Sequence, residues 1–439
     1  MRRRSAGTPA ARPLPRPGAV ASGKVRVAVA VLIAACAAVS ACGAGSPRRG
    51  GASPAASPVV SPGASTPGPL ATTTAPALVT TPANCPATSR HDDGFRAATA
   101  SSGWELAWLD DAPGGTSLRA GAATADGALW ALFGRQGGAV EPRRWDGGEW
   151  QAPPSAPSSQ EVRALGAASA DRAWVVVIAA DGAPVLTVWD GAAWRATPLG
   201  LGAVTGAGPA AAGPWLALGT GSTRWDGAAW RYAPLPLHVN ALTGPGDEPW
   251  AIGVADPTDP DAPAALARWT GAAWQSVPVP ALDLPPDAEP VHADQGRTLV
   301  KSVVRTGPQE WWVLGAFQWM EHEHVDEEDI FPGRSVALRL GGGTWTCVVG
   351  ASWPDGWKGF TAAAPDGRGG LWAVSVPDEL WHLSEGRWTR ERPPARGAGR
   401  ASVEDLVARP GTGELYALGS IGTQPYGEGS RAALWRLRP

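Results

Sequence analysis

The sequence lacks the residue patterns of several large enzyme classes. It contains no Gly-x-Ser-x-Gly, no phosphate-binding loop and no Gly-x-Gly-x-x-Gly in a βαβ context, which weighs against serine hydrolases and nucleotide-binding enzymes. Its four cysteines form neither a Cys-x-x-Cys pair nor a zinc-type spacing with histidine. Helical periodicity is also nearly absent. We therefore expect a strand-rich chain without a familiar short catalytic motif.

A basic excess is also missing. The chain has 37 Lys and Arg against 40 Asp and Glu, and seven of the basic residues lie within residues 1–41. Without that segment the net charge is near −10. A charge of this sign argues against nucleic acid or an anionic membrane surface as the main partner.

Residues 1–41 have the pattern of an export signal. Basic residues come first, an apolar run from Val27 to Ala38 follows, and Val39-Ser40-Ala41-Cys42 comes next. The last four residues resemble the lipobox of bacterial lipoproteins, which implies diacylation of Cys42 and anchoring in the lipid bilayer on the extracytoplasmic side of the cell membrane. The alternative is an ordinary signal peptide cleaved near Ala41, which leaves a soluble secreted chain.

Residues 42–90 are predicted to be a disordered tether behind the lipid anchor. Most of this segment is Ala, Pro, Ser, Thr and Gly, a composition that cannot offset the entropy cost of ordering. Beyond the proposed anchor the only cysteines are Cys85 and Cys347. Export permits a disulfide between them; two unpaired buried cysteines are the alternative.

The remaining chain, residues 91–439, is built from a repeat. The segment Arg-Trp-Asp-Gly-Gly-Glu-Trp at 144–150 recurs, lightly changed, at 189–194, 225–230 and 269–274, with weaker copies at 340–345 and 381–388. The fourth-strand tryptophans are 36 to 46 residues apart, except for one interval of 71, and such a spacing is typical of propeller blades. Each unit also has an earlier strand with an aromatic near its start, and seven such strands predict seven blades.

The two ends of the repeat region complement each other. The last unit stops at 434–439, the equivalent of a third strand, whereas Gly103 to Trp108 looks like a fourth strand with no blade before it. We therefore predict an all-β fold, a seven-bladed β-propeller of four-stranded antiparallel blades. The N-terminal strand completes the last blade and closes the ring.

Most of the 24 tryptophans are explained by this architecture. Nineteen occupy recurring strand positions, where large flat side chains fill the space between blades. The five that do not are Trp108, Trp311, Trp319, Trp353 and Trp357.

Loop lengths predict which face of the propeller carries a binding site. The turns between first and second strands, and between third and fourth strands, share one face and are short; we call it the plain face. The other face, the elaborated face, holds nearly every long loop, including 316–334 and 350–359. Loops that extend from a rigid scaffold usually carry binding. The predicted site is therefore on the elaborated face, near blades four and five.

Unusual residues gather in this predicted region. The candidate ligand-binding residues are Trp319, His322, His324, Trp353, Trp357 and Lys358, and the candidate ligands of a divalent cation are His322, His324, Asp326 and Glu328. Three interpretations stay open. The acidic loop is solvated and without a ligand, or it binds a divalent cation with a spacing that fits no established loop, or exposed Trp faces bind a carbohydrate or peptide.

Support for catalysis in the sequence is thin. Glycosidases need two carboxylates across the scissile bond, and Glu161, Glu404 and Asp405 lie near strand starts that face the central funnel of a propeller. Retaining sialidases use a tyrosine nucleophile, and of the three tyrosines Tyr416 stands at a second-strand position that we expect to be buried.

The repeat resembles a known group of propellers. Its Leu-Trp-Ala-Val/Leu-Gly strand, followed by Arg-Trp-Asp-Gly-x-x-Trp, is similar to bacterial lipoprotein β-propellers with BNR or sialidase-like repeats and to those of photosystem II assembly factors. The resemblance covers roughly residues 100–439 and implies the fold and an extracytoplasmic setting. The sequence departs from the sialidase Asp-box, which begins with Ser and spaces its Asp and Gly by one residue, so no catalytic residue is transferred.

The sequence thus favours a lipid-anchored, extracytoplasmic, monomeric propeller. We expect it to be a binding or assembly module for a glycan, peptide or protein partner in the cell envelope, rather than an enzyme, and to need no cofactor beyond a divalent cation at most. The alternatives are a glycan-active hydrolase or lyase that uses Glu404, Asp405 or the blade-five acids, and a structural protein that depends on a bound cation.

Overall fold

A computed structural model describes Cys85 and residues 88–439, apart from gaps at 112–113, 136, 160, 201–203, 209–213, 227–228, 247, 260–261, 291–295, 323–328, 354–358, 376–378 and 424–428. Residues 72–439 form one compact unit, and the second unit, residues 1–71, lies outside the described residues together with the export signal and Cys42. Within the described part of the chain, no helix has the length and apolar character that a membrane span requires.

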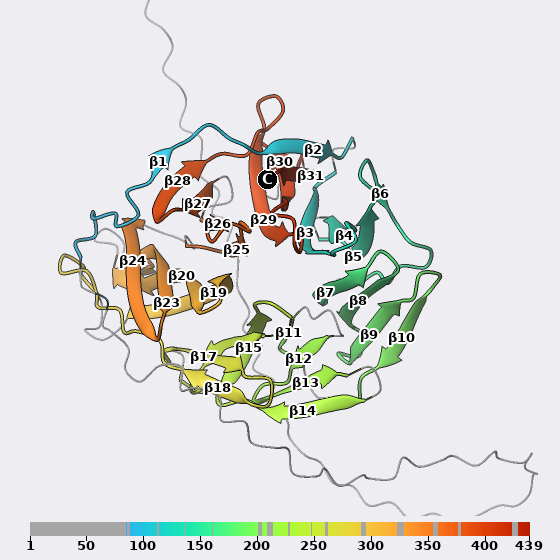
Figure 1. The fold of residues 1–439 in the computed structure, drawn as a ribbon, viewed down its shortest axis with the longest axis horizontal. Coiled ribbons are helices and arrows are strands. Elements are labelled where there is room, and N and C mark those ends of the chain that lie inside the picture. Colours follow the sequence, from blue (N-terminus) through green and yellow to red (C-terminus); the bar gives the residue numbers. More distant parts are fainter. Residues whose placement is uncertain are drawn as a thin grey trace, which may run out of the picture. The chain divides into compact units, whose positions relative to one another are not determined.

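The described residues form seven sheets arranged in a ring, so the predicted seven-bladed propeller is confirmed (Figure 1). Blades one to three consist of β3 (Thr116–Ala123), β4 (Leu129–Arg135), β5 (Val140–Trp145) and β6 (Trp150–Gln151); β7 (Val162–Ser169), β8 (Arg172–Ile178), β9 (Pro184–Trp189) and β10 (Trp194–Pro198); and β11 (Gly206–Gly208), β12 (Trp215–Ala217), β13 (Gly221–Trp225) and β14 (Trp230–Pro234).

Blades four to six consist of β15 (His238–Thr243), β16 (Trp250–Val254), β17 (Ala264–Trp269) and β18 (Trp274–Val277); β19 (Gly296–Gly307), β20 (Glu310–Trp319), β23 (Gly333–Gly341) and β24 (Thr344–Trp353); and β25 (Ala362–Pro365), β26 (Leu371–Val374), β27 (Leu380–Ser384) and β28 (Arg387–Glu391). Blade seven contains β29 (Arg400–Ala408), β30 (Leu415–Gly422) and β31 (Arg431–Leu437). The first strand of each blade lies nearest the centre of the ring (Figure 1).

The N-terminal strand closes the ring as predicted. β2 (Glu105–Leu109) pairs antiparallel with β31, with Leu106 opposite Trp435. Trp104, only 3% exposed, belongs to the same buried cluster as Trp435. Blade seven therefore takes one strand from the start of the domain and three from its end, and its outermost strand depends on the N-terminal segment.

The chain before β2 adds a feature that the repeat did not predict. β1 (Ala98–Thr99) pairs in parallel with β28 and becomes a fifth strand of blade six. We call Cys85 together with residues 88–104 the N-terminal strap, and its path along the outer edges of blades five to seven is visible in Figure 1. Because β1 is held by backbone bonds of a two-residue strand, no side-chain pattern marks it in the sequence.

The Trp-Asp-Gly segments form the tight turns between third and fourth strands. In the first copy Gly147 has φ of 103°, a region that favours glycine. Oδ1 of Asp146 accepts hydrogen bonds from the N–H groups of Gly148 and Glu149 at 2.9 and 2.8 Å. Those bonds, first the one from Glu149, hold the pKa of Asp146 below its ordinary value. The motif is therefore an element of turn structure.

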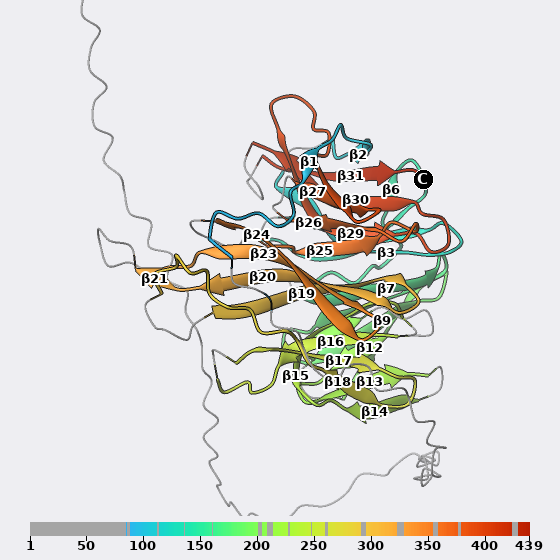
Figure 2. The same ribbon diagram turned by 60° about the vertical axis from the view of Figure 1, so that its left-hand side comes forward.

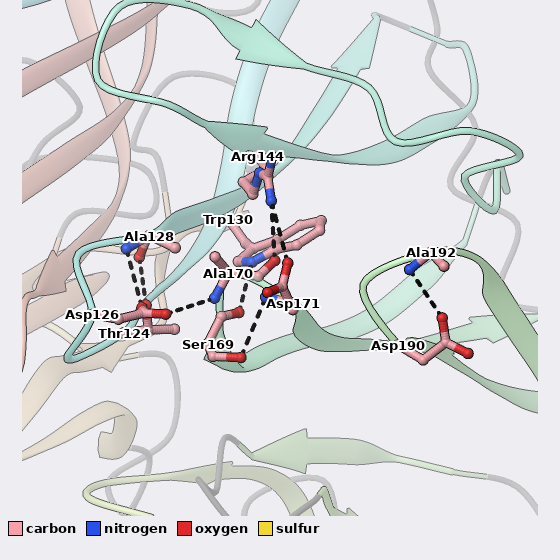
Figure 3. A network of polar contacts seen from close by, with 10 residues as sticks. All are labelled: Thr124, Asp126, Ala128, Trp130, Arg144, Ser169, Ala170, Asp171, Asp190 and Ala192. Atoms are coloured by element: carbon pink, nitrogen blue, oxygen red, sulfur yellow. Dashed lines mark hydrogen bonds and ion pairs between the residues drawn. The ribbon is translucent and has the colours of Figure 1, made fainter.

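The short turns of the plain face also join neighbouring blades. Figure 3 shows the contact between blades one and two. Oδ2 of Asp126, in the β3–β4 turn, accepts a hydrogen bond from the N–H of Ala170 at 3.0 Å. Trp130 Nε1 donates to Ser169 O at 3.3 Å, and Arg144 Nη1 donates to Ala170 O at 3.3 Å. Polar groups on this face are thus satisfied by other turns of the protein.

A glycine three residues after the second-strand aromatic allows the first strand to approach closely. A Cβ added at Gly253, Gly315 or Gly419 would lie 1.9 Å from a carbonyl oxygen of the first strand in the same blade. The pairing register of β15, β19 and β29 shifts directly after that carbonyl. The repeated glycine therefore makes room for a β-bulge in the innermost strand.

Candidate functional site

The two faces of the propeller differ as the loop lengths predict. The two longest connections between blade strands, 278–295 and 320–332, belong to the elaborated face. Within the β20–β23 loop, β21 (Glu321–His322) pairs antiparallel with β22 (Asp329–Ile330), and this small hairpin extends outward from blade five (Figure 2). Blade five is therefore the most elaborated part of the described structure.

The N-terminal strap is fastened to blade five. Cys85 forms a disulfide with Cys347 of β24, with the Cα atoms 5.7 Å apart. The guanidinium of Arg334, which is 2% exposed, donates hydrogen bonds to three strap carbonyl oxygens at 2.9 to 3.2 Å. Gly94 N donates to Val349 O at 2.9 Å. The folded part of the chain therefore includes Cys85 and the residues that follow it at 88–90.

Trp319 lies in the core, and the expectation that it presents an exposed ring is wrong. Its side chain is 2% exposed and packs in the cluster shared by blades four and five. Its Nε1 donates to Oε1 of Glu321 at 2.7 Å, and that buried carboxylate also accepts bonds from Arg90 and from the N–H of Glu289. The ring of Trp319 is therefore packed in the core and its N–H is bonded to Glu321. This side chain stabilises the loops instead of presenting a surface to a ligand.

Most of the proposed cation ligands fall outside the described residues. The backbone of His322 pairs with Asp329 in the β21–β22 hairpin, but its side chain belongs to the undescribed part. His324, Asp326, Glu328, Trp357 and Lys358 also lie outside the described residues. Among the residues that are described, no cluster of three or more His, Cys, Asp or Glu could hold a metal ion.

Trp353 lines a small cavity on the elaborated face between blades five and six. The cavity has a volume of about 80 Å³, and its walls include Trp353 of β24, Trp381 of β27, Arg390 of β28 and Asp93 and Phe95 of the strap. β24 ends at Trp353, and β27 begins at Leu380 beside Trp381, so these side chains lie at strand ends on the elaborated face. Three segments far apart in sequence therefore meet here.

The cavity combines aromatic walls with one cation. Phe95 is buried and packs edge-on against Trp381, with the ring centroids 5.4 Å apart. The guanidinium of Arg390 lies 5.9 Å from the centroid of Trp381, and its Nη1 is 3.6 Å from Oε1 of Glu379. Arg390 remains 41% exposed. The cavity is thus suited to an apolar side chain that has an acidic group next to it.

An exposed phenylalanine lies on the same part of blade five. Phe331 is 41% exposed, and among the described residues Tyr232 is the only other large hydrophobic side chain that is exposed. It precedes β23, whose first residue, Gly333, is paired with Trp353. An exposed apolar residue therefore lies close along the chain to the cavity wall, as expected at an interaction surface.

The carboxyl groups considered for catalysis lie on the first strands near the centre of the ring. Oδ2 of Asp405 accepts a hydrogen bond from the N–H of Gly121 in blade one, and Oδ1 accepts one from the N–H of Leu406, both at 2.9 Å. Burial raises the pKa of Asp405 to about 6 and the pKa of Glu404 to about 7. Glu161 is exposed and forms an ion pair with Arg163. Asp405 therefore joins blade seven to blade one instead of facing a substrate.

The residues that the sequence did not single out for the site are Asp93, Phe95, Trp381 and Arg390. Trp381 was assigned to a repeated structural position, and it is 6% exposed. The same side chain therefore packs in the core and lines the cavity. The strap residues stand before the first repeat, where no periodicity predicts a partner. The pairing of two distant cysteines was the one signal that linked the strap to blade five.

Comparisons with known proteins find similar structures but no similar sequence. No family model and no curated protein matches the sequence. Among solved structures, the chain is similar to Ycf48 bound to D1 peptide (TM-score 0.47, 13% identity, 78% of this chain and 97% of that one) and to Ycf48 from Cyanidioschyzon merolae (0.45, 12%, 77% and 99%). It is also similar to the GH74 xyloglucanase from Xanthomonas campestris (0.45, 14%, 73% and 54%). At these identities the likeness concerns the fold alone.

Proposed function

We propose that this propeller is a binding or assembly module for a peptide or protein partner in the cell envelope. The observation that carries the proposal is the cavity of about 80 Å³ on the elaborated face, with Trp353, Trp381 and Phe95 as apolar walls and Arg390 at its side. A site formed by a strap and two blades is held in shape by the disulfide and the bonds of Arg334. Such preorganisation lowers the cost of binding.

The size of the cavity favours a peptide or protein over a small molecule. Pockets for small ligands usually enclose about 300–1,000 Å³, several times the volume found here. A cavity of this size is suited to one anchoring side chain, which is how buried residues at the centre of protein interfaces contribute most of the binding energy. A glycan platform is less favoured because Trp319, one of its proposed stacking rings, is buried.

A glycan hydrolase or lyase remains the alternative function and has less support. Asp405 is held by two backbone N–H groups, and Glu404 stands next to it in the chain rather than across a substrate. Glycosidases place their two carboxyl groups about 5–10 Å apart around the scissile bond. Turnover of an envelope polysaccharide by the full chain, abolished by Glu404→Gln, would establish the alternative instead.

The test of the binding proposal fills the cavity. The full chain is expressed in its native host, crosslinked to neighbouring proteins and purified. The amount of crosslinked partner is compared for the wild type, Ala351→Trp and Ala196→Trp. Ala351 lines the cavity, whereas Ala196 is exposed on β10 of blade two. We expect Ala351→Trp to reduce the captured partner about tenfold or more, the loss of one anchoring contact. Equal capture by both variants contradicts the proposal.

Export and lipid attachment at Cys42 belong to the same proposal. The support is the sequence pattern of residues 1–41 and the disulfide, which is favoured outside the cytoplasm. Incorporation of labelled fatty acid into the wild type, and its loss in Cys42→Ala, tests the anchor. A wild type without label contradicts it. Cation binding by His322, His324, Asp326 and Glu328 is tested by the melting temperature with and without chelator.

A further inference from the structure

The first strands of five blades carry a β-bulge at one level of the ring. In β15, for example, Val239 pairs with Gly253 and Ala241 pairs with Ile252, so Asn240 is the extra residue. The extra residues of β7, β19 and β29 lie at the same position relative to the aromatic of the second strand. In β3 the bulge spans the same level and is one residue longer. The residues at the five bulges are Arg119, Arg163, Asn240, Lys301 and Glu404.

Blades three and six have a threonine at the same level. The N–H of Thr205 donates to Ala217 O at 3.0 Å, and the N–H of Thr361 donates to Val374 O at 2.9 Å. Ala217 and Val374 each lie two residues after the second-strand tryptophan, and β11 and β25 begin immediately after the two threonines. Thr205 and Thr361 therefore complete a circle of seven polar residues, which we call the channel ring.

The first strands, which carry or directly follow the residues of the channel ring, form the inner edge of the blades around the central opening (Figure 1). Arg119, Arg163, Asn240 and Lys301 are exposed although their neighbours on the same strands are buried or half-buried. A first strand has a sheet partner on one side and neighbouring blades above and below, so the solvent that reaches these side chains is that of the central opening. The ring lies near the starts of β7 and β15, and hence toward the elaborated face.

Three of the seven ring residues are basic, in a protein of net charge −3. Both arginines also have protein partners: Arg163 forms an ion pair with Glu161, and Arg119 donates to Arg135 O at 3.4 Å. Arg119 and Arg163 come from adjacent blades, and Lys301 comes from blade five. The fourth ionisable residue, Glu404, lies beside them with Oε1 shielded from solvent and, within the described part of the chain, without a hydrogen-bond partner. The carboxyl of Glu404 is also hydrogen-bonded to Ser117 and interacts with the charge of Arg119.

We propose that the channel ring is a second ligand site, which binds an anionic group, a carboxylate or a phosphate, presented from the elaborated face. The guanidinium groups of Arg119 and Arg163 donate charge-assisted hydrogen bonds to the anion.

The state of Glu404 fits an anionic ligand. Burial raises the pKa of Glu404 to about 7, although Ser117 and Arg119 oppose that rise. Near neutral pH a large share of this carboxyl is therefore protonated and does not repel an anion. The site needs no group that the protein lacks, and it is separate from the cavity between blades five and six.

The test is direct binding by the full chain. Inorganic phosphate and glucuronate are titrated separately by calorimetry at an ionic strength fixed with sodium chloride. The variants are Arg119→Gln and Arg163→Gln, and the matched control is Arg195→Gln, an exposed arginine that pairs with Asp190 next to a plain-face turn. We expect at least one anion to bind the wild type, and each ring variant to weaken it about tenfold or more. The control should bind like the wild type.

Each outcome bears on the proposal. Binding of phosphate alone assigns a phosphorylated ligand, and binding of glucuronate alone assigns a carboxylate. Failure of both anions to bind the wild type overturns the proposal, as does unchanged binding by both ring variants. Arg163→Lys keeps the charge and should retain more affinity than Arg163→Gln, which separates loss of binding from loss of folding. Ala351→Trp should not change anion binding, so the two proposed sites fail independently.

Discussion

The plain-face turns and the channel ring repeat in opposite ways. In the turns the same residue does the same work: Asp146 and Asp190 each accept two N–H bonds from their own turn. In the channel ring the backbone irregularity recurs, but the side chains differ from blade to blade, with arginine, asparagine, lysine, threonine and glutamate among them. Repetition of a side chain indicates a structural role, whereas repetition of a backbone position with varied side chains leaves a surface free for recognition.

The cavity between blades five and six also depends on side chains that do not repeat, because some of its walls come from outside the repeat. Asp93 and Phe95 come from the part of the strap before β1, outside the repeat, and they complete a site that no single blade contains. Substitutions in the scaffold should therefore lower stability, whereas substitutions at the recognition surface should change binding.

Removal of a buried scaffold tryptophan should have the largest effect. Trp435 is fully buried, and its Nε1 donates to Pro394 O at 2.7 Å. We expect Trp435→Ala to lower the free energy of unfolding by about 3–5 kcal/mol, because it leaves a cavity at the seam that closes the ring. Urea denaturation measures this loss. Tyr232→Ala is the control, since Tyr232 is 65% exposed; a loss of similar size there would remove the distinction.

Loss of the strap disulfide should have the next largest effect. The double variant Cys85→Ala, Cys347→Ala is expected to lower the free energy of unfolding by about 2–4 kcal/mol, because the crosslink restricts the unfolded chain. Denaturation with and without a thiol reductant measures it. The reductant should destabilise the wild type and leave the double variant unchanged. Equal sensitivity of both proteins would show that the disulfide is not the cause.

The acids at the centre of the ring should make stability fall as pH rises. Glu404 and Asp405 have folded-state pKa values of about 7 and about 6, above their ordinary values. The folded state therefore holds protons that the unfolded state releases. The contribution of the two groups to stability is present below about pH 4 and is lost as the pH rises through about 7, by an amount on the order of 3 kcal/mol for each group.

Denaturation midpoints at about pH 5 and pH 8 measure this dependence. The first of these lies above the range in which Asp190 titrates, since its pKa is lowered to about 2 by the side chain of Arg195 and by its own turn. Glu404→Gln should flatten the pH dependence. A wild type that gains stability over this range, relative to Glu404→Gln, contradicts the assignment.

Loss of a plain-face connection should cost less. Asp126→Ala removes the bond to Ala170, which joins blades one and two, and the bond to Ala128 within its own turn. Because Asp126 is exposed to solvent, we expect a loss of no more than about 1 kcal/mol, and no change in anion binding. Denaturation and the anion titration together measure it; a variant with wild-type stability and altered anion binding would reverse the roles assigned to the two regions.

Substitution within the channel ring should change stability least. Arg163 is 43% exposed and its ion-pair partner Glu161 is 49% exposed. Arg163→Gln is therefore expected to leave the free energy of unfolding within about 0.5 kcal/mol of the wild type. A loss above about 2 kcal/mol would show that the ring is part of the scaffold.

Much of the fold could be predicted because the repeat is local. The Asp-Gly turns and the second-strand aromatics depend on residues a few positions away in the chain. The strand at Gly103 has no blade of its own, and this predicts that it pairs with the incomplete last blade. The strap could not be placed in this way. Its fifth strand at Ala98–Thr99 depends on backbone bonds, and its other contacts depend on Arg334, which carries no signal in the sequence.

The candidate site was predicted only in part. Loop lengths led to the elaborated face and to Trp353, which does line the cavity. The same argument was wrong for Trp319. A tryptophan next to an acidic loop has the same sequence pattern whether its ring is exposed or, as here, buried and bonded to Glu321. Burial of one side chain depends on every segment that packs over it.

The sequence by itself determined the number of blades, the position of the tight turns and the closure of the ring, because these follow from a period and from local backbone preferences. Only the tertiary structure decided which tryptophans are hidden, where the strap runs and which seven residues share one level of the channel. Those properties depend on contacts between residues up to hundreds of positions apart, such as Cys85 with Cys347, and no local pattern encodes such a distance.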